Sequence, residues 1–225
     1  MAKMSAHLEP QTGTRSGDPI TVAVVEDVEG IRENLVLLLN GAPGYQCVGA
    51  YPDAERAVAA LRESNPEVIL MDINLPGASG IEATRAVKEF RPDARILILT
   101  VYEESQALFD SLKAGACGYL LKRTSPEKIL EAIREAHGGG VPLNPQMAAK
   151  IAEYFRRSGG AGDDVGRLSE RERQVLELMA EGFLYKEIAH RLHIQTETVH
   201  QFTKRIYEKL HVHSRTEAVV KFLKR

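Results

Sequence analysis

Apolar residues follow two patterns along the chain, and the change from one to the other divides it. Between residues 20 and 140, short runs of Val, Ile and Leu alternate with stretches in which apolar residues recur every three or four positions. This order predicts five strands, each followed by a helix, and hence a parallel sheet covered by helices on both faces. The predicted strands are 20–25, 46–50, 68–71, 95–100 and 118–121, and the predicted helices are 28–40, 53–64, 80–90, 104–115 and 125–139.

From residue 167 onward only the helical pattern is present. Ser169 and Glu172 have the spacing of a capping box, which begins a helix. Four short helices are expected, at 169–181, 185–192, 196–210 and 216–224. In the third of them, apolar residues fall on one side, and a polar and basic side is left for a partner. The expected fold class is therefore α/β followed by an all-α four-helix unit.

The segment between the two patterns has the composition of a connection. Asn144 can cap a helix that has Pro145 at its first position. The sequence SGGAGDDVG that follows is typical of a flexible linker. We therefore expect four parts: a flexible tail over 1–18, an α/β domain over 19–140, a linker helix and flexible linker over 141–166, and a helical domain over 167–225.

Composition indicates a soluble globular protein, with 44% hydrophobic and 27% charged residues. No apolar stretch is long enough to span a bilayer, and residues 1–18 lack the apolar segment of a secretory signal. We therefore expect a cytoplasmic protein without membrane contact. The two cysteines, Cys47 and Cys117, have no metal-like spacing and are expected to be small buried hydrophobes.

Charge is divided unevenly between the two patterns. Residues 167–225 carry 12 Lys and Arg against 8 Asp and Glu, whereas residues 1–166 carry 17 against 23. An acidic front and a basic tail indicate two modules with different partners, and a basic module favours nucleic acid.

Three carboxylates, one hydroxyl and one ammonium group stand at the ends of the predicted strands. In open parallel sheets the carboxyl ends of the strands form the ligand site, where strand order reverses. Two neighbouring carboxylates at about 4 Å repel by roughly 4 kcal/mol at an effective dielectric of 20, so a cation is needed there. A lysine and Mg²⁺ would both serve, and a carboxylate beside them could accept a phosphoryl group. The residues are Glu26, Asp27, Asp72, Thr100 and Lys122.

Over residues 20–138 the chain resembles the response regulators of two-component signalling. The resemblance rests on the motifs VVEDVEGIRENL, MDINLPGASGIEA, ILILTVY and AGACGYLLK, in this order and spacing. It implies a five-stranded flavodoxin-like (CheY-like) receiver domain. Two departures are present: Glu26 stands where aspartate is commoner, and Arg123 follows the lysine where proline or aspartate is often found.

The resemblance also implies a role for each residue of the site. Asp72 would be the phosphoacceptor, with Thr100 and Lys122 holding the phosphoryl group. Thr100 and Tyr119 would form a switch in which the aromatic ring moves when the threonine is drawn toward that group. Mg²⁺ would be bound by Asp27 directly, by Glu26 partly through water, by Asp72, and by the backbone carbonyl of Asn74.

Residues 167–225 resemble the helix-turn-helix domain of the LuxR/NarL class, through LSERERQVLELMAEG, KEIAHRL, TVHQFTKRIYEKL and SRTEAV. The helix that begins near Thr196 would enter the major groove of double-stranded DNA. The expected DNA contacts are Lys186, Thr198, His200, Gln201, Lys204 and Arg205. Four positions depart from the class: Leu184 and Gln195 replace Ser or Thr caps, Tyr185 replaces a frequent Asn, and His200 replaces a common Lys.

Together the two resemblances indicate a response regulator transcription factor of the NarL/FixJ group. A sensor histidine kinase would phosphorylate Asp72 with Mg²⁺, which would control dimerisation to a homodimer and DNA binding. One alternative is a phosphorylation-independent DNA-binding regulator whose receiver only dimerises. Another is a regulator that senses a small ligand, although the sensor domains of such proteins differ from this βα series.

A third alternative is a Mg²⁺-dependent phosphohydrolase with Asp72 as a transient nucleophile. The predicted rim offers no histidine or further acid to protonate a leaving group, so we expect no enzyme beyond slow self-dephosphorylation.

Overall fold

The computed structural model describes residues 18–101, 105–144, 146–147, 149–150, 166–212 and 214–223. Its sheet has five parallel strands in the order β2-β1-β3-β4-β5. The strands are β1 (Ile20–Val25), β2 (Tyr45–Tyr51), β3 (Val68–Met71), β4 (Arg95–Thr100) and β5 (Gly118–Leu121). The predicted α/β class is confirmed, and we call β1 through α5 the α/β unit.

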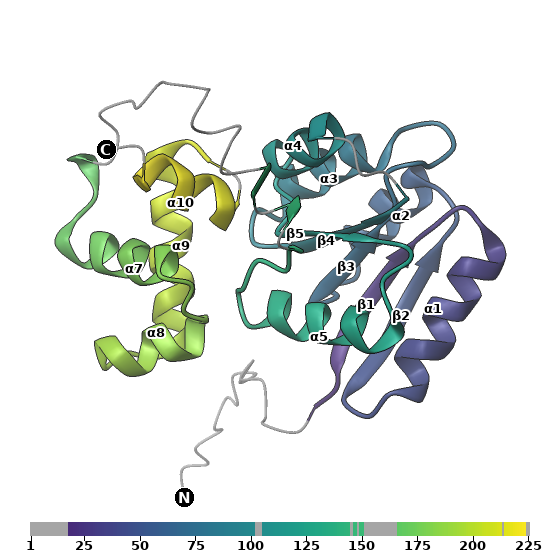
Figure 1. The fold of residues 1–225 in the computed structure, drawn as a ribbon, viewed down its shortest axis with the longest axis horizontal. Helices are drawn as coiled ribbons and strands as arrows, with labels where there is room; N and C mark the ends of the chain where they lie inside the picture. The colour runs from purple at the N-terminus through teal and green to yellow at the C-terminus, as the bar shows by residue number, and fades with distance from the viewer. Residues whose placement is uncertain are drawn as a thin grey trace, which may run out of the picture.

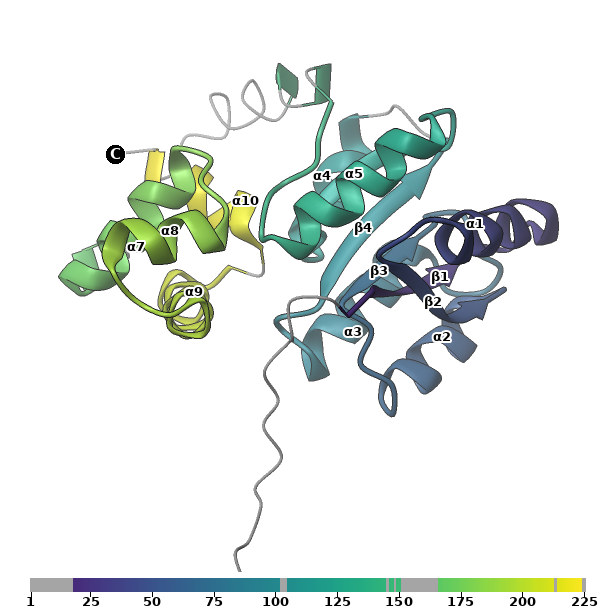
Figure 2. The ribbon, with the colours of Figure 1, turned by 90° about the horizontal axis from the view of Figure 1, so that it is seen from below.

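Helices cover both faces of the sheet, as Figures 1 and 2 show. The helices α1 (Glu29–Gly41) and α5 (Pro126–His137) cover one face, and α2 (Ala54–Leu61), α3 (Gly80–Phe90) and α4 (Ser105–Lys113) cover the other. Alternate residues of β1, β3, β4 and β5 enter opposite cores: Val22 and Val24 of β1 join the first, whereas Ala23 and Val25 join the second. Burial on both faces explains why β3 and β4 are nearly continuous apolar runs, whereas the edge strand β2 alternates between buried or half-buried and exposed residues.

The start of α3 is fixed by the turn that follows β3. Ser79 and Glu82 form a capping box, with Ser79 N–H donating to the Glu82 carboxylate at 2.8 Å. Gly80 N–H donates to the carbonyl of Ile73 at 2.9 Å, and a Cβ at Gly80 would overlap the carbonyl oxygen of Asp72. Only glycine therefore lets α3 begin directly against the strand end that carries Asp72.

The C-terminal helices form a second core of their own, which we call the helical unit. They are α7 (Glu170–Ala180), α8 (Tyr185–Leu192), α9 (Thr196–Leu210) and α10 (Arg215–Leu223). The predicted apolar side of α9 is confirmed, because Val199, Ile206 and Leu210 are fully buried and Phe202 packs against them. The capping box of Ser169 and Glu172 is present at the start of α7.

Glu172 ties the start of α7 to the end of α9. Its carboxylate accepts hydrogen bonds from Ser169 N–H and Lys209 Nζ, each at 2.7 Å, and the residue is 3% exposed. Burial alone would raise the pKa of Glu172, but the hydrogen bonds from Lys209 and Ser169 outweigh it and lower the pKa. The charged carboxylate is therefore a structural element of the helical unit.

Replacing Glu172 with glutamine is expected to lower the free energy of unfolding by about 2 kcal/mol at neutral pH. The pKa of Glu172 in the folded state lies below its ordinary value of 4.5. The stabilisation by the charged carboxylate is therefore complete above pH 4.5, and it disappears as the pH falls through the folded-state pKa. Urea unfolding measures this: the difference in the free energy of unfolding between the parent protein and Glu172→Gln should be smaller at about pH 3 than at neutral pH. The exposed Glu177→Gln should stay within about 0.5 kcal/mol of the parent; an equal loss in both variants would contradict a specific role.

Several element boundaries differ from those expected. Strand β2 is one residue longer at each end, because Tyr45 pairs with Ile20 and Tyr51 with Val25. Helix α2 ends at Leu61 instead of 64, and α10 begins at Arg215, one residue early. Asn144 acts as the predicted cap, its Oδ1 accepting from Met147 N–H at 2.8 Å. Most of the expected linker helix, the flexible linker before residue 166, and the tail over 1–17 lie outside the described residues.

The cysteines are only partly buried, and neither forms a disulfide. Burial raises the pKa of the Cys117 thiol to about 11, which keeps it a neutral thiol. Among the described residues, no helix is both long enough and apolar enough for a membrane span.

Candidate metal centre and nucleic-acid interface

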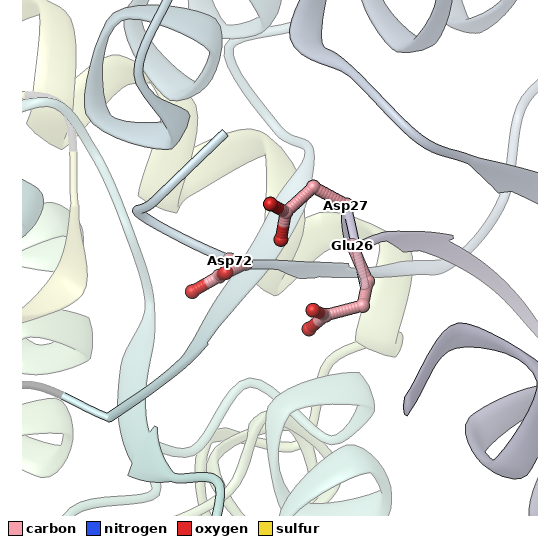
Figure 3. A group of neighbouring side chains, drawn as sticks. All are labelled: Glu26, Asp27 and Asp72. Carbon is pink, nitrogen blue, oxygen red and sulfur yellow. The ribbon is translucent and has the colours of Figure 1, made fainter. Parts of the chain in front are cut away.

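Three carboxylates meet at the carboxyl edge of the sheet. Glu26 and Asp27 follow β1, and Asp72 follows the neighbouring β3, so the two strands deliver them to one place (Figure 3). One oxygen from each lies within 4.8 Å of the others. The position is where strand order reverses, because β1 pairs with β2 on one side and β3 on the other. The predicted convergence of the acids is confirmed.

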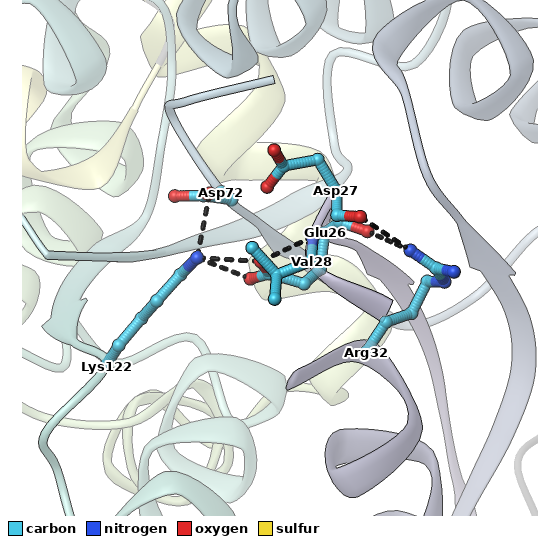
Figure 4. A network of polar contacts seen from close by, with 6 residues as sticks. All are labelled: Glu26, Asp27, Val28, Arg32, Asp72 and Lys122. Atoms are coloured by element: carbon cyan, nitrogen blue, oxygen red, sulfur yellow. Dashed lines mark hydrogen bonds and ion pairs between the residues drawn. The ribbon is translucent and has the colours of Figure 1, made fainter. Parts of the chain in front are cut away.

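Lys122, directly after β5, reaches across to two of these acids (Figure 4). Its Nζ lies 2.7 Å and 2.8 Å from the two carboxylate oxygens of Glu26 and 2.9 Å from Asp72 Oδ2. Burial of the Lys122 ammonium opposes its charge, but the hydrogen bonds that it donates to Glu26 and Asp72 outweigh burial and raise the lysine pKa. Burial raises the pKa of Glu26 despite the same lysine. One ammonium therefore does not offset all the negative charge.

Asp72 keeps one oxygen ready for a further partner. The residue is 2% exposed, and its Oδ1 is buried without a hydrogen-bond partner in the described part of the chain. A buried carboxylate oxygen is costly when unpaired, and a hard divalent cation prefers such oxygen ligands. The residues present therefore fit Mg²⁺, with Asp27 exposed beside them and Asn74 exposed two residues after Asp72.

The two predicted switch residues lie deep in the sheet. Thr100 ends β4 and Tyr119 stands in β5, and both are 0% exposed. Tyr119 also forms a bridge with Leu143, and its N–H donates to the carbonyl of Pro142 at 3.0 Å. The strand that carries Tyr119 is thus in contact with the segment that leaves the α/β unit.

Arg32 on α1 is a site residue that the sequence analysis missed. Its Nη1 donates to the main-chain carbonyls of Glu26 at 2.8 Å and Asp27 at 3.0 Å (Figure 4). One guanidinium therefore fixes the turn that presents both acids. The only signal in the sequence is its place one turn into the helix after the acid pair, which does not reveal bonds to carbonyl groups.

Replacing Arg32 with alanine is expected to weaken binding of Mg²⁺ or Mn²⁺ about tenfold, because loss of a charged hydrogen bond costs about 1.5 kcal/mol. Lys should restore part of the affinity, since it can reach only one carbonyl at a time. Titration of Mn²⁺ followed by electron paramagnetic resonance measures this, with Arg56→Ala on α2 as the control. Unchanged affinity in Arg32→Ala would refute the role.

The predicted DNA-contact residues lie on α8 and α9 but do not share one environment. Lys186 on α8 and Gln201, Lys204 and Arg205 on α9 are exposed, whereas Thr198 is half-buried. Neither residue at the two expected cap positions caps its helix through a side chain: Gln195 makes no side-chain cap bond, and Leu184 has no side-chain oxygen. Glu187 compensates in part, because its carboxylate accepts from Leu184 N–H at 2.7 Å.

His200 was expected on the open polar side of α9, but in the structure it packs against other side chains. It is half-buried, its Nε2 lies 3.5 Å from Nη2 of Arg95 at the start of β4, and its ring meets the Tyr185 ring edge-on. The amphipathic pattern of α9 could not show this, because a polar side chain against another domain and one in water look alike in sequence.

Backbone groups extend the contact between the two units. Tyr185 N–H donates to Gly138 O at 3.0 Å, and the buried guanidinium of Arg215 donates to the carbonyls of Gly139, Met179 and Phe183. A Cβ at Gly139 would lie 2.6 Å from the Tyr185 ring, so the glycine backbone packs flat against it. Figure 1 shows the helical unit beside the edge of the sheet that β5 forms, with α4 and α5 on the two faces nearby.

Two family models match the chain. The response regulator receiver domain matches residues 22–134, and the luxR family of bacterial regulatory proteins matches residues 166–222. Among curated relatives, the transcriptional regulatory protein DegU of Brevibacillus brevis is 31% identical over 91% of this chain and 93% of its own. The nitrate/nitrite response regulator NarL of Escherichia coli strain K12 is 32% identical over 90% and 94%.

Solved structures give the same picture. A LuxR-family two-component response regulator from Aurantimonas sp. SI85-9A1 has a TM-score of 0.57 and 35% identity, covering 61% of this chain and 98% of its own. The RcsB response regulator of Salmonella typhimurium has a TM-score of 0.55 and 25% identity, covering 92% and 98%.

Proposed function

Since the chain belongs to the response regulators, with a receiver domain and a LuxR-type DNA-binding domain, we propose that phosphorylation of Asp72 controls its activity as a transcription regulator. The observation that carries the proposal is the buried Asp72 Oδ1 without a partner, beside an Oδ2 that Lys122 holds at 2.9 Å. One oxygen of Asp72 is thus paired with Lys122, and the other has no hydrogen-bond partner in the described part of the chain.

The reaction transfers a phosphoryl group to the carboxylate of Asp72. An Asp72 oxygen forms the new O–P bond while the bond from phosphorus to the donor breaks, and the donor is a phosphohistidine of a sensor kinase or acetyl phosphate. Lys122 keeps its charge throughout and holds the phosphoryl oxygens, together with the Thr100 hydroxyl. Among the described residues, the cluster of Glu26, Asp27 and Asp72 includes no histidine that could act as a general acid. This favours a phosphoryl acceptor over an enzyme that hydrolyses many substrate molecules.

Mg²⁺ would be held by Glu26, Asp27, Asp72 and the backbone carbonyl of Asn74. When bound it supplies positive charge against the oxygens of the transferred group. Arg32 keeps the two acids after β1 in place for it.

Strand β4 connects the reacting edge to the helical unit. Thr100 ends the strand at the phosphorylation site, and Arg95 begins it beside His200 of α9. Movement of Thr100 toward the phosphoryl group, with the accompanying movement of the Tyr119 ring, would shift β4 and β5 against the segment at Pro142 and Leu143. The helical unit would then separate from the receiver, and α9 would become free to enter the major groove of double-stranded DNA, as a homodimer on paired half-sites in the cytoplasm.

The test is DNA affinity before and after phosphorylation of the full chain. A duplex is selected from a random library, and its binding is followed by fluorescence anisotropy with and without acetyl phosphate and Mg²⁺. Binding should tighten at least about tenfold, a change of about 1.4 kcal/mol, and sedimentation should show a dimer. Equal affinity, with phosphoryl uptake verified by intact mass, would contradict the proposal and support the phosphorylation-independent regulator.

A further inference from the structure

His200 is held between two side chains from different parts of the chain. Its Nε2 faces Nη2 of Arg95 at 3.5 Å, and its ring centroid lies 4.8 Å from that of Tyr185 with an interplanar angle of 86°. Arg95 belongs to the receiver, whereas Tyr185 and His200 belong to the helical unit. The imidazole is therefore part of the closed interface between the two domains.

The contact with Arg95 requires a neutral imidazole. A guanidinium has only hydrogen-bond donors, so Nε2 must present its lone pair and the ring proton must sit on Nδ1. A second proton would place an N–H against an N–H, with two positive charges at the distance of a hydrogen bond. Protonation therefore opposes closure at this point.

The other charged groups near His200 do not reverse this preference. Asp93, in the turn before β4, and Glu197, on α9 itself, favour the protonated ring, whereas Arg95 and His137 of α5 oppose it. His137 is also bound to Glu67, with Nε2 3.1 Å from the carboxylate. Burial first and Arg95 second lower the pKa of His200 below its ordinary 6.5.

We propose that closure of the helical unit on the receiver is sensitive to protonation, with neutral His200 as the closing contact and charged His200 as the opening one. This sensitivity to protons is separate from control by phosphorylation, and it rests on the proposed function only because α9 is taken as the helix that faces DNA. Opening in mild acid would expose a newly charged His200 beside Gln201 and Lys204, which suits a phosphate backbone. Proton uptake and DNA binding would then support one another.

The direction follows from the two states. In the open state His200 lies in water with a pKa near 6.5, and in the closed state the pKa is lower. The closed state therefore binds fewer protons than the open state. It is favoured above pH 6.5, and this preference is lost as the pH falls from 6.5 toward the pKa of His200 in the closed state. Each unit of pKa difference changes the ratio of closed to open molecules by about tenfold at most.

The amide of Tyr185 gives a direct measure of closure. It is the first residue of α8, so its N–H has no partner within the helix, and its bond goes to Gly138 O of the receiver. Its protection from hydrogen exchange therefore reports the closed state, whereas the amide of Ile188, bonded to Leu184 O, reports the helix alone. Both are measured by NMR on the unphosphorylated full chain without DNA.

When the pH is lowered from about 8 to about 5.5, the hydrogen-exchange protection of the Tyr185 amide, corrected for the pH dependence of intrinsic exchange, should fall at least about threefold. The protection of the Ile188 amide should stay constant. His200→Gln should remove the fall, because glutamine can accept from Arg95 and does not titrate. His190→Gln on the exposed side of α8 should retain it. Arg95→Gln should move the NMR-measured pKa of His200 upward toward 6.5.

Constant protection of Tyr185 in the parent protein, or an equal fall in His200→Gln, would overturn the proposal. Since no phosphodonor or DNA is present, neither result bears on the role of Asp72. A parallel fall at Ile188 would mean that the helix unfolds, which also contradicts a domain opening.

Discussion

Replacing Asp72 with asparagine is expected to abolish phosphoryl uptake from acetyl phosphate. The amide has nearly the same shape but no negative oxygen to attack phosphorus, and it removes one of the three acids at the edge of the sheet. Intact mass after incubation with acetyl phosphate and Mg²⁺ should show one added phosphoryl group in the parent protein and none in the variant. We expect a loss of at least about a thousandfold in rate, the scale of removing a nucleophile.

Asp110→Asn on α4 is the matched control, because it makes the same change on a half-buried carboxylate outside the site. It should be phosphorylated like the parent. Chelation with EDTA should prevent uptake in both. Phosphorylation of Asp72→Asn at the parent rate would show that another side chain is the acceptor and would remove the basis of the proposed function.

The second large effect concerns the turn beneath Asp72. Gly80→Ala would place a Cβ against the carbonyl oxygen of Asp72, and backbone on both sides leaves no flexible side chain to move away. We expect the free energy of unfolding to fall by about 3 kcal/mol, the upper part of the usual range for overpacking. Urea unfolding of the full chain measures it, and Mg²⁺-dependent phosphorylation should slow because Asp72 is displaced.

Gly30→Ala provides the matched comparison on α1. No atom lies within 4 Å of a Cβ built at Gly30, so alanine should stabilise the helix by about 0.5–1 kcal/mol. Opposite signs at the two glycines are expected. A neutral Gly80→Ala would mean that the turn relaxes easily and that α3 does not need to begin so close to the strand.

The fold could be predicted largely because its patterns are local. Strands buried on both faces must be apolar throughout, and the helical spacing of α3, α8 and α9 gave their bounds without error. The acid site was predictable for a related reason: parallel strands bring their ends together, so residues far apart in sequence such as Glu26 and Asp72 had to meet.

What the sequence analysis missed depends on contacts that no periodicity encodes. Arg32 acts through carbonyl groups, which every residue has, so its partners are visible only once the turn after β1 is folded. Arg95 is the first residue of a strand and could have faced water. His200 was expected on an open surface, and its packing on Arg95 and Tyr185 depends on how two separately folding patterns meet.

The main-chain carbonyl groups of Gly138 and Gly139 are part of the receiver's contact with α8 and α10. Carbonyl groups do not change when side chains mutate, so this part of the surface is insulated from sequence drift in α5. A chimeric regulator that joins this helical unit to another receiver should therefore need two glycines after the last helix of the host in order to dock at this place. A bulky residue at the second glycine would prevent docking, because it would collide with the Tyr185 ring.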